Sequence, residues 1–173
     1  MTRPSPQRRA VLLSLAVAAT LATSGCSAID GLLGPGEAQR EESSGTVTAA
    51  SDADVFSLRV GDCLDTTKVG DDTEQLTSLP VVPCADEHDA EIYAETTLPE
   101  GDWPGEDAVA ATADEFCHGE YADFVGLDYD SSKLEYWPLT PVKEGWNSID
   151  DRLVQCVLQS AEAVTGSLEG SAV

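Results

Sequence analysis

The chain has 173 residues, of which 32 are acidic and nine are Lys or Arg, and its formal net charge is −23 at pH 7. Nucleic-acid phosphates and anionic lipid head groups repel such a chain, which excludes both as binding partners. Cations and basic proteins would be attracted to it. The acids are spread along the whole chain rather than concentrated in one run, a distribution that also serves simply to keep a protein soluble.

The N-terminus has the features of an export signal. Arg3, Arg8 and Arg9 precede an apolar run over residues 10–23, which is shorter than the roughly 20 residues needed to span a bilayer. Residues 7–12 also resemble a twin-arginine signal, so the sequence is compatible with export by either the Sec or the twin-arginine route. We therefore expect residues 1–25 to be a signal peptide.

The apolar run ends in Thr23-Ser24-Gly25-Cys26. Small residues before a cysteine resemble the lipobox of bacterial lipoproteins, although Thr23 stands where that family usually has leucine. The resemblance implies a fatty acid such as palmitate on Cys26 and anchoring at the outer face of the cytoplasmic membrane. The alternative is an ordinary secretory signal that happens to end near a cysteine.

Composition divides the rest of the chain into three parts. Residues 26–54 are rich in glycine and polar side chains, which is typical of a flexible, acidic tether. Residues 55–160 are long enough for one domain with one core. Residues 161–173 are expected to form a plain, frayed C-terminal tail.

Hydrophobic periodicity predicts the elements of that domain. A helix is expected over residues 106–124, where one apolar stripe follows acids that suit the N-terminal end of the helix dipole. Strands or extended segments are expected on both sides of it, at 55–60, 79–84, 88–98, 134–139 and 153–159. The prolines in 79–84 are typical of a sheet edge or of the approach to a strand, and residues 141–150 are expected to form a turn. The predicted fold is a small α+β domain with a mainly antiparallel sheet packed on one main helix.

The segment 88–98 is the clearest strand. Its even positions from His88 are mostly apolar, and Asp89, Glu91 and Glu95 occupy odd positions. This alternation predicts a half-buried strand with His88 directed to the apolar side. Adjacent strand residues face opposite ways, so Asp89 is not expected to orient His88.

The cysteines predict two disulfides. If Cys26 carries lipid, an even set remains, Cys63, Cys84, Cys117 and Cys156, which outside the cytoplasm is most simply two bridges. The helix stripe carries Cys117 and an apolar strand face carries Cys156, which favours joining these two and leaves Cys63 with Cys84. The two other connectivities stay open from sequence alone.

Several of these residues together resemble the actinobacterial septum-formation domain, over roughly residues 56–158. The resemblance rests on the four cysteines, on Trp146 ahead of the last strand, and on motif residues that lie close to the first two cysteines, namely Gly61, Asp62, Pro83, His88, Asp89 and Glu91. It implies an exported, membrane-anchored or lipidated envelope protein connected with division. It supplies no catalytic residues.

The residue types present suggest four kinds of chemistry. A hydrolase using His88 lacks a nucleophile elbow in the chain, and thiol–disulfide exchange lacks a Cys-x-x-Cys motif. A zinc site would need Cys84, His88, Cys117 and His118, but their spacing fits no common zinc module. Residues 71–74 and 128–131 are rich in oxygen ligands, yet neither has the layout of a calcium-binding EF-hand loop. No catalytic residue, metal or cofactor is therefore assigned.

Three tryptophans are the remaining candidates for a binding face. Trp103, Trp137 and Trp146 lie in or beside loops that contain proline or glycine, where aromatic side chains often contact partners or sugars. Their alternative role is to cover the edge of a small core. We expect a non-catalytic, lipid-anchored envelope protein that binds an envelope partner, with an envelope hydrolase or a cation- or solute-binding lipoprotein as alternatives. The oligomeric state stays open.

Overall fold

The computed structural model describes residues 36–69 and 76–173. Residues 1–35, with the predicted signal peptide and Cys26, lie outside this range. The elements in chain order are β1 (Ser51–Asp54), the 3-10 turn η2 (Val55–Ser57), β2 (Cys63–Leu64), η3 (Thr66–Lys68), β3 (Ser78–Val82), β4 (His88–Thr97), α1 (Glu106–Val125), η4 (Tyr129–Ser131), β5 (Glu135–Leu139), α2 (Lys143–Ser148) and β6 (Leu153–Val164).

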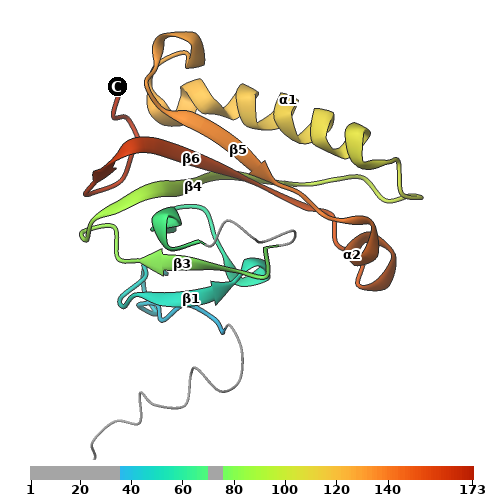
Figure 1. The fold of residues 1–173 in the computed structure, drawn as a ribbon, viewed down its shortest axis with the longest axis horizontal. Coiled ribbons are helices and arrows are strands. Elements are labelled where there is room, and N and C mark those ends of the chain that lie inside the picture. Colours follow the sequence, from blue (N-terminus) through green and yellow to red (C-terminus); the bar gives the residue numbers. More distant parts are fainter. Residues whose placement is uncertain (1–35, 70–75) are drawn as a thin grey trace, which may run out of the picture.

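The strands form one antiparallel sheet. Within the described residues its order is β1-β3-β2-β4-β6-β5, so that β1 and β5 are the two edges. The long strands β4 and β6 pair along most of their length at the centre. Figure 1 shows α1 running alongside β5, β6 and β4, while β1 and β3 lie on the far side of β4 from the helix. The predicted α+β class is confirmed.

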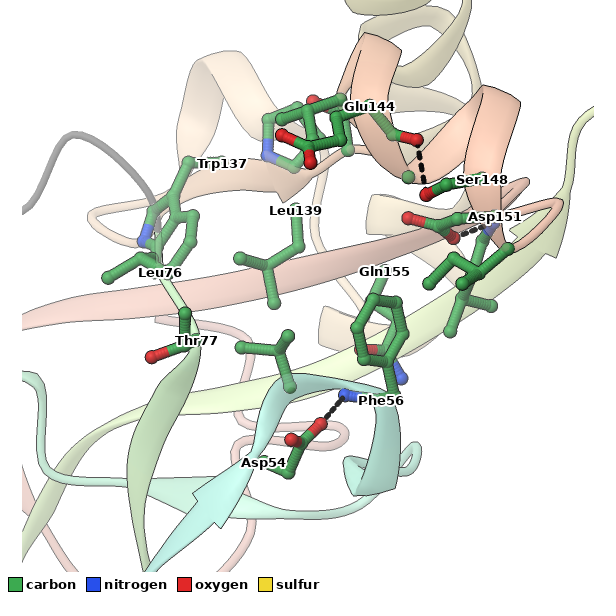
Figure 2. A pocket seen from close by; sticks show the side chains of 17 residues that line it. Asp54, Phe56, Leu76, Thr77, Trp137, Leu139, Glu144, Ser148, Asp151 and Gln155 are labelled. Atoms are coloured by element: carbon green, nitrogen blue, oxygen red, sulfur yellow. Dashed lines mark hydrogen bonds between the residues drawn. The ribbon is translucent and has the colours of Figure 1, made fainter. Parts of the chain in front are cut away.

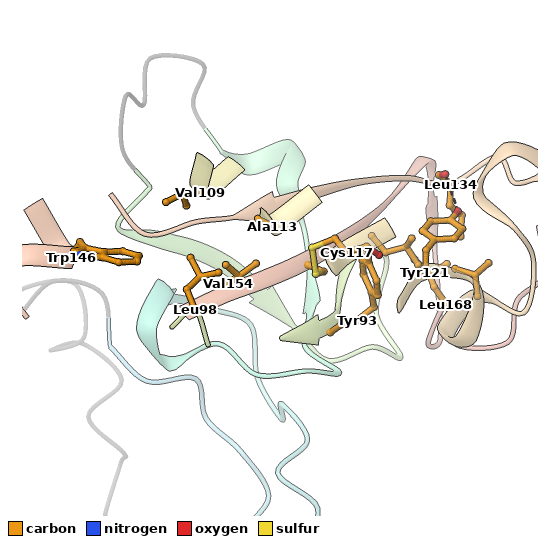
Figure 3. Packing of buried hydrophobic residues seen from close by; sticks show 14 residues of the cluster. Tyr93, Leu98, Val109, Ala113, Cys117, Tyr121, Leu134, Trp146, Val154 and Leu168 are labelled. Atoms are coloured by element: carbon orange, nitrogen blue, oxygen red, sulfur yellow. Dashed lines mark hydrogen bonds between the residues drawn. A yellow bond between two sulfur atoms is a disulfide. The ribbon is translucent and has the colours of Figure 1, made fainter. Parts of the chain in front are cut away.

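Each face of the central strands is buried under a different layer. On β6, Val154, Cys156 and Leu158 belong to the core cluster under α1, whereas Val157 belongs to a second cluster with Leu79 and Val81 of β3. Figure 3 shows the first cluster extending from Trp146 at one end to Leu168 at the other. The β1–β3 part of the sheet therefore curls over the face that α1 leaves open.

The predicted half-buried character of the 88–98 strand is wrong. Every residue of β4 from His88 to Ala94 is buried, including Asp89 and Glu91. The curled sheet covers one face, α1 and the C-terminal segment cover the other, and an irregularity between Ile92 and Ala94 breaks the alternation. Such a β-bulge shifts which side chains face which layer. The acids on this strand therefore need internal partners.

The predicted helix is confirmed, with one more residue than expected. Five residues four positions apart are buried along α1, namely Val109, Ala113, Cys117, Tyr121 and Val125. Gly126 ends the helix in the left-handed region at φ 79°, where its N–H donates to the carbonyl of Ala122. Glycine adopts this conformation without the strain that a Cβ would bring. Over residues 36–69 and 76–173, no helix combines the length and apolar character needed to cross a bilayer.

Two short segments differ from their predictions. Residues 55–57 form the turn η2 rather than a strand, because Asp54 caps it by accepting a hydrogen bond from the Phe56 N–H. Strand β3 is not an edge strand, since it pairs with β1 and with β2. Proline is tolerated at position 80 because the β2 ladder reaches only Val81 and Val82. The predicted turn at 141–150 contains the short helix α2.

Both ends of the described chain are folded where composition predicted a tether and a tail. Residues 36–54 include strand β1 and the buried side chains of Ala38, Val47 and Ala53. Strand β6 continues to Val164, and Leu168 beyond it is buried. Long-range contacts fix these polar stretches, which is why local composition gave no sign of them.

The predicted disulfide connectivity is confirmed. Cys63 is joined to Cys84, with 5.2 Å between their Cα atoms, and Cys117 is joined to Cys156, with 5.5 Å. The first bridge fastens β2 to the end of β3, and the second fastens α1 to β6. The first bridge therefore joins two neighbouring strands of the sheet, and the second ties the helix layer to a central strand.

Candidate functional site

The motif residue Asp62 holds the N-terminal segment against the sheet. Both its carboxylate oxygens accept from the guanidinium of Arg40, at 2.5 and 2.7 Å, and one also accepts from the Arg59 N–H. The Arg40 and Asp62 side chains are only 10% and 4% exposed. A bidentate pair of this kind fixes position and orientation together. Gly61 precedes it at φ 90°, a conformation that suits glycine at this bend.

Asp89 and Glu91 likewise hold other segments of the chain in place. The Asp89 carboxylate accepts from the backbone N–H of Thr66 at 2.6 Å and from the Thr66 hydroxyl. The Glu91 carboxylate accepts from the Ser167 hydroxyl at 2.8 Å and from the Leu168 N–H at 2.6 Å. Each buried motif acid thus satisfies its oxygens with donors from a distant segment.

Burial of Glu91 has an electrostatic consequence. Desolvation raises its pKa above the ordinary glutamate value of 4.5, although the hydrogen bonds from Leu168 and Ser167 oppose that rise. The folded protein therefore binds this proton more tightly than the unfolded chain does. The stability that results is complete below the unfolded pKa and is lost as pH rises through the folded pKa.

Replacing Glu91 with glutamine is expected to remove this pH dependence. Relative to wild type, Glu91→Gln should gain stability as pH rises from about 4.5, by ~1.4 kcal/mol for each unit that separates the two pKa values. Glutamine has an NH2 group in place of one carboxylate oxygen and can lose one hydrogen-bond acceptor. That loss changes the free energy of unfolding by an amount that does not vary with pH. Urea denaturation of both proteins, from below the glutamate pKa to neutrality, measures the difference. A stability difference between the two proteins that stays constant over this pH range would contradict the raised pKa of Glu91.

His88 and Pro83 both make local contacts at the turn that precedes β4. The Nδ1 of His88 lies 2.9 Å from the carbonyl of Asp86, and its Nε2 is buried without a hydrogen-bond partner among the described residues. Pro83 opens the turn into β4, where its carbonyl accepts from the Asp86 N–H at 2.8 Å. The neighbouring Asp89 is engaged by Thr66. The structure therefore does not pair His88 with the carboxylate that a hydrolase would need to orient it.

The metal alternatives find no support in the geometry. Cys84 and Cys117, required for the zinc reading, both belong to disulfides. Among the described residues, no group of three or more His, Cys, Asp and Glu side chains is arranged to hold a metal ion. The oxygen-rich residues 71–74 lie outside the described range.

The three tryptophans do not form a single face. The rings of Trp103 and Trp146 pack edge to face at 5.3 Å on the α1 side of the sheet, and the guanidinium of Arg152 lies 3.6 Å from the Trp146 ring centroid. The Trp146 Nε1–H donates to the carbonyl of Gly101. Trp137 instead packs against the opposite core cluster and donates to the Gln159 side chain. The first two cover the edge of the core, whereas Trp137 lines a cavity.

That cavity is an open groove of about 560 Å³. One wall carries Asp54 and Phe56, at the end of edge strand β1, and the other carries Trp137 and Leu139 of edge strand β5. Helix α2 and the residues beside it complete the second wall. In Figure 2 the side chain of Leu139 points between Trp137 and the turn that bears Phe56. We call this cavity the edge groove, because residues from both edges of the curled sheet line it.

The edge groove exposes large apolar side chains. Phe56, Val142 and Ile149 line it and are 58%, 40% and 63% exposed. Sequence analysis missed these residues, because their exposure depends on the curl of the sheet. A local signal was present, because two apolar residues, Val142 and Ile149, lie near the two ends of the predicted 141–150 turn.

Comparison with protein families gives one finding. The family model described as septum formation matches residues 31–136 and 60–172. Neither the curated proteins nor the solved structures give a match. A role linked to septum formation follows from the family, and the two disulfides are consistent with an extracytoplasmic protein. Because the two matched ranges together cover most of the chain, this protein belongs to the septum formation family.

Proposed function

We propose that this protein is a non-catalytic, lipid-anchored component of the cell envelope whose domain binds another envelope protein during septum formation. The observation that carries the binding role is the edge groove. It is concave, and it presents Phe56, Val142 and Ile149 to solvent. Apolar side chains gathered at a concave surface are typical of interaction sites.

The motif acids support a binding role over catalysis. Asp62, Asp89 and Glu91 are buried, and their oxygens accept hydrogen bonds from segments that they hold in place. Catalytic acids and bases must instead reach a substrate. The motif therefore supports the shape of the domain, and the edge groove supplies its contact surface.

The anchor is inferred from the lipobox-like segment Thr23-Ser24-Gly25-Cys26. A lipid on Cys26 would keep the domain at the outer face of the cytoplasmic membrane, where the machinery that builds a septum meets the envelope. The acidic surface would not bind anionic lipids by itself, so the anchor would provide the attachment.

Tagged full-length variants in dividing cells test the proposal. Ile149→Glu places a charge in the edge groove and is expected to reduce partner cross-linking from a photoreactive residue at Val142 by at least ~30-fold. Its septal enrichment should be lost as well. Val60→Glu is the matched control, because Val60 is also exposed, at 47%, but does not line the groove. Both variants should keep the wild-type melting temperature.

The lipid anchor on Cys26 is tested in the same cells. Cys26→Ala is expected to abolish labelling by a palmitate analogue and to release the protein from the membrane fraction, while both groove variants stay labelled. Equal cross-linking by Ile149→Glu and Val60→Glu would refute the groove as the contact surface. A wild-type protein spread evenly around the cell throughout division would refute the septal role.

A further inference from the structure

We infer that the edge groove receives a polypeptide segment that pairs an apolar side chain with a lysine or arginine. This inference rests on the proposed function and specifies the partner's chemistry. It is carried by the combination of apolar walls and an acidic rim in the same cavity. Neither feature alone would select this class of segment.

Both walls of the groove carry apolar side chains. Trp137 and Leu139 on β5 and Leu153 on β6 line it together with Phe56. Phe56 comes from η2, which follows β1, so the apolar lining includes both edges of the sheet. An aromatic or aliphatic side chain that fills this space would be removed from water and packed against rings and branched carbons, which is favourable.

The rim carries charge of one sign. The charged residues among the described groove lining are Asp54, Glu144 and Asp151, and none is a Lys or Arg. Asp54 stands on the η2 wall, whereas Glu144 and Asp151 stand on the α2 wall (Figure 2). The ion pairs within the described residues involve Asp62, Asp65 and Asp150, and therefore none of these three rim carboxylates.

The rim carboxylates determine which kind of segment the groove binds. A neutral or anionic segment that closed over the groove would partly desolvate the rim carboxylates without compensation, which costs free energy. A cationic side chain beside the apolar one would pair with them instead. The net charge of −23 would also attract such a segment over a distance and speed its association.

The free edge of β5 favours side-chain capture over strand addition. Pro138 lies within this edge strand and has no N–H to donate to an added strand. A segment in the groove would therefore be held mainly by its side chains. Apolar contact and ion pairing then carry both the affinity and the selectivity.

Fluorescence anisotropy tests the inference on the full chain, purified from membranes in neutral detergent. Two rhodamine-labelled peptides share a Phe-Leu centre, flanked by lysines in one and by glutamates in the other. The lysine peptide is expected to bind at least ~10-fold more tightly. Glu144→Gln should weaken its binding by about two- to fivefold. Glu115→Gln should not, since Glu115 is an exposed α1 residue outside the groove.

The outcomes separate the two proposals. Equal affinity for both peptides, or equal weakening by Glu144→Gln and Glu115→Gln, would overturn the inference and leave the groove as a contact surface intact. Failure of both peptides to bind would also overturn it. Ile149→Lys places a positive charge beside the peptide's lysines, so binding of the lysine peptide that survives this change would show that the peptide lies elsewhere and would overturn the inference too. The proposed function is decided separately, by cross-linking in cells.

Discussion

Replacing Cys117 and Cys156 together with alanine is expected to lower the free energy of unfolding by about 4 kcal/mol, and replacing Cys63 and Cys84 by about 3 kcal/mol. The bridges close loops with sequence separations of 39 and 21 residues. In the chain-entropy model the longer loop restricts the unfolded chain more. Urea denaturation followed by circular dichroism measures both losses.

The two losses should add. The loops 63–84 and 117–156 do not overlap, so each bridge restricts a separate part of the unfolded chain. Together they would remove about 7 kcal/mol, comparable with the whole stability of a typical domain, about 5–15 kcal/mol. A reducing agent should therefore unfold the wild type or bring it close to unfolding.

The quadruple alanine variant is the control, because a reducing agent should have no further effect on it. Losses below ~1 kcal/mol for both double variants would show that the bridges do not constrain the unfolded chain as this model requires. A large stabilising role is the one expected of disulfides in a domain of this size.

The central elements could be predicted because their signals are local. Strand β4 shows alternation in its sequence, and α1 repeats buried residues at four-residue steps from Val109 to Val125. The cysteine pairing followed from the same periods, since Cys117 falls on the helix stripe and Cys156 on the face of β6 that α1 covers. Periodicity identifies which face of an element is buried, and that was sufficient for these contacts.

The folded ends could not be predicted, because their partners are remote. Arg40 reaches Asp62 across 22 positions, and Ser167 reaches Glu91 across 76. The sequence shows the residues of each pair, but no local pattern indicates that they meet. Asp89 and Glu91 were predicted to lie on the polar face of the 88–98 strand. Both are buried, and Asp89 holds Thr66 whereas Glu91 holds the C-terminal segment at Ser167 and Leu168.

The edge groove was unpredictable for a related reason. Phe56 and Ile149 are far apart in the chain, and the curl of the sheet brings their segments to one cavity. Strand alternation determines which side chains share a face, but it does not determine how far a sheet bends. Exposed apolar residues on two separate loops can be recognised as parts of one groove only after that bend is known.

Removing the Asp62 carboxylate is expected to cause the largest loss from any single polar substitution. Asp62→Ala leaves the Arg40 guanidinium without its partner and the Arg59 N–H without its acceptor. Breaking a buried ion pair from one side costs about 3–5 kcal/mol. Arg40→Ala should cost less, because the N-terminal segment can detach and let water reach Asp62. Chemical denaturation measures the loss of stability, and hydrogen exchange over residues 36–50 measures the detachment.

Asp65→Ala is the matched control. Asp65 also pairs with a basic side chain, Lys68, but that lysine side chain is 62% exposed. Although the Asp65 side chain is only 17% exposed, water and salt reach its lysine partner, so this variant should lose at most about 1 kcal/mol of stability. If Asp62→Ala behaved like Asp65→Ala, the N-terminal segment would not depend on the ion pair. If Asp62→Ala unfolds early and residues 36–50 exchange first, this motif acid holds the N-terminal segment against the sheet.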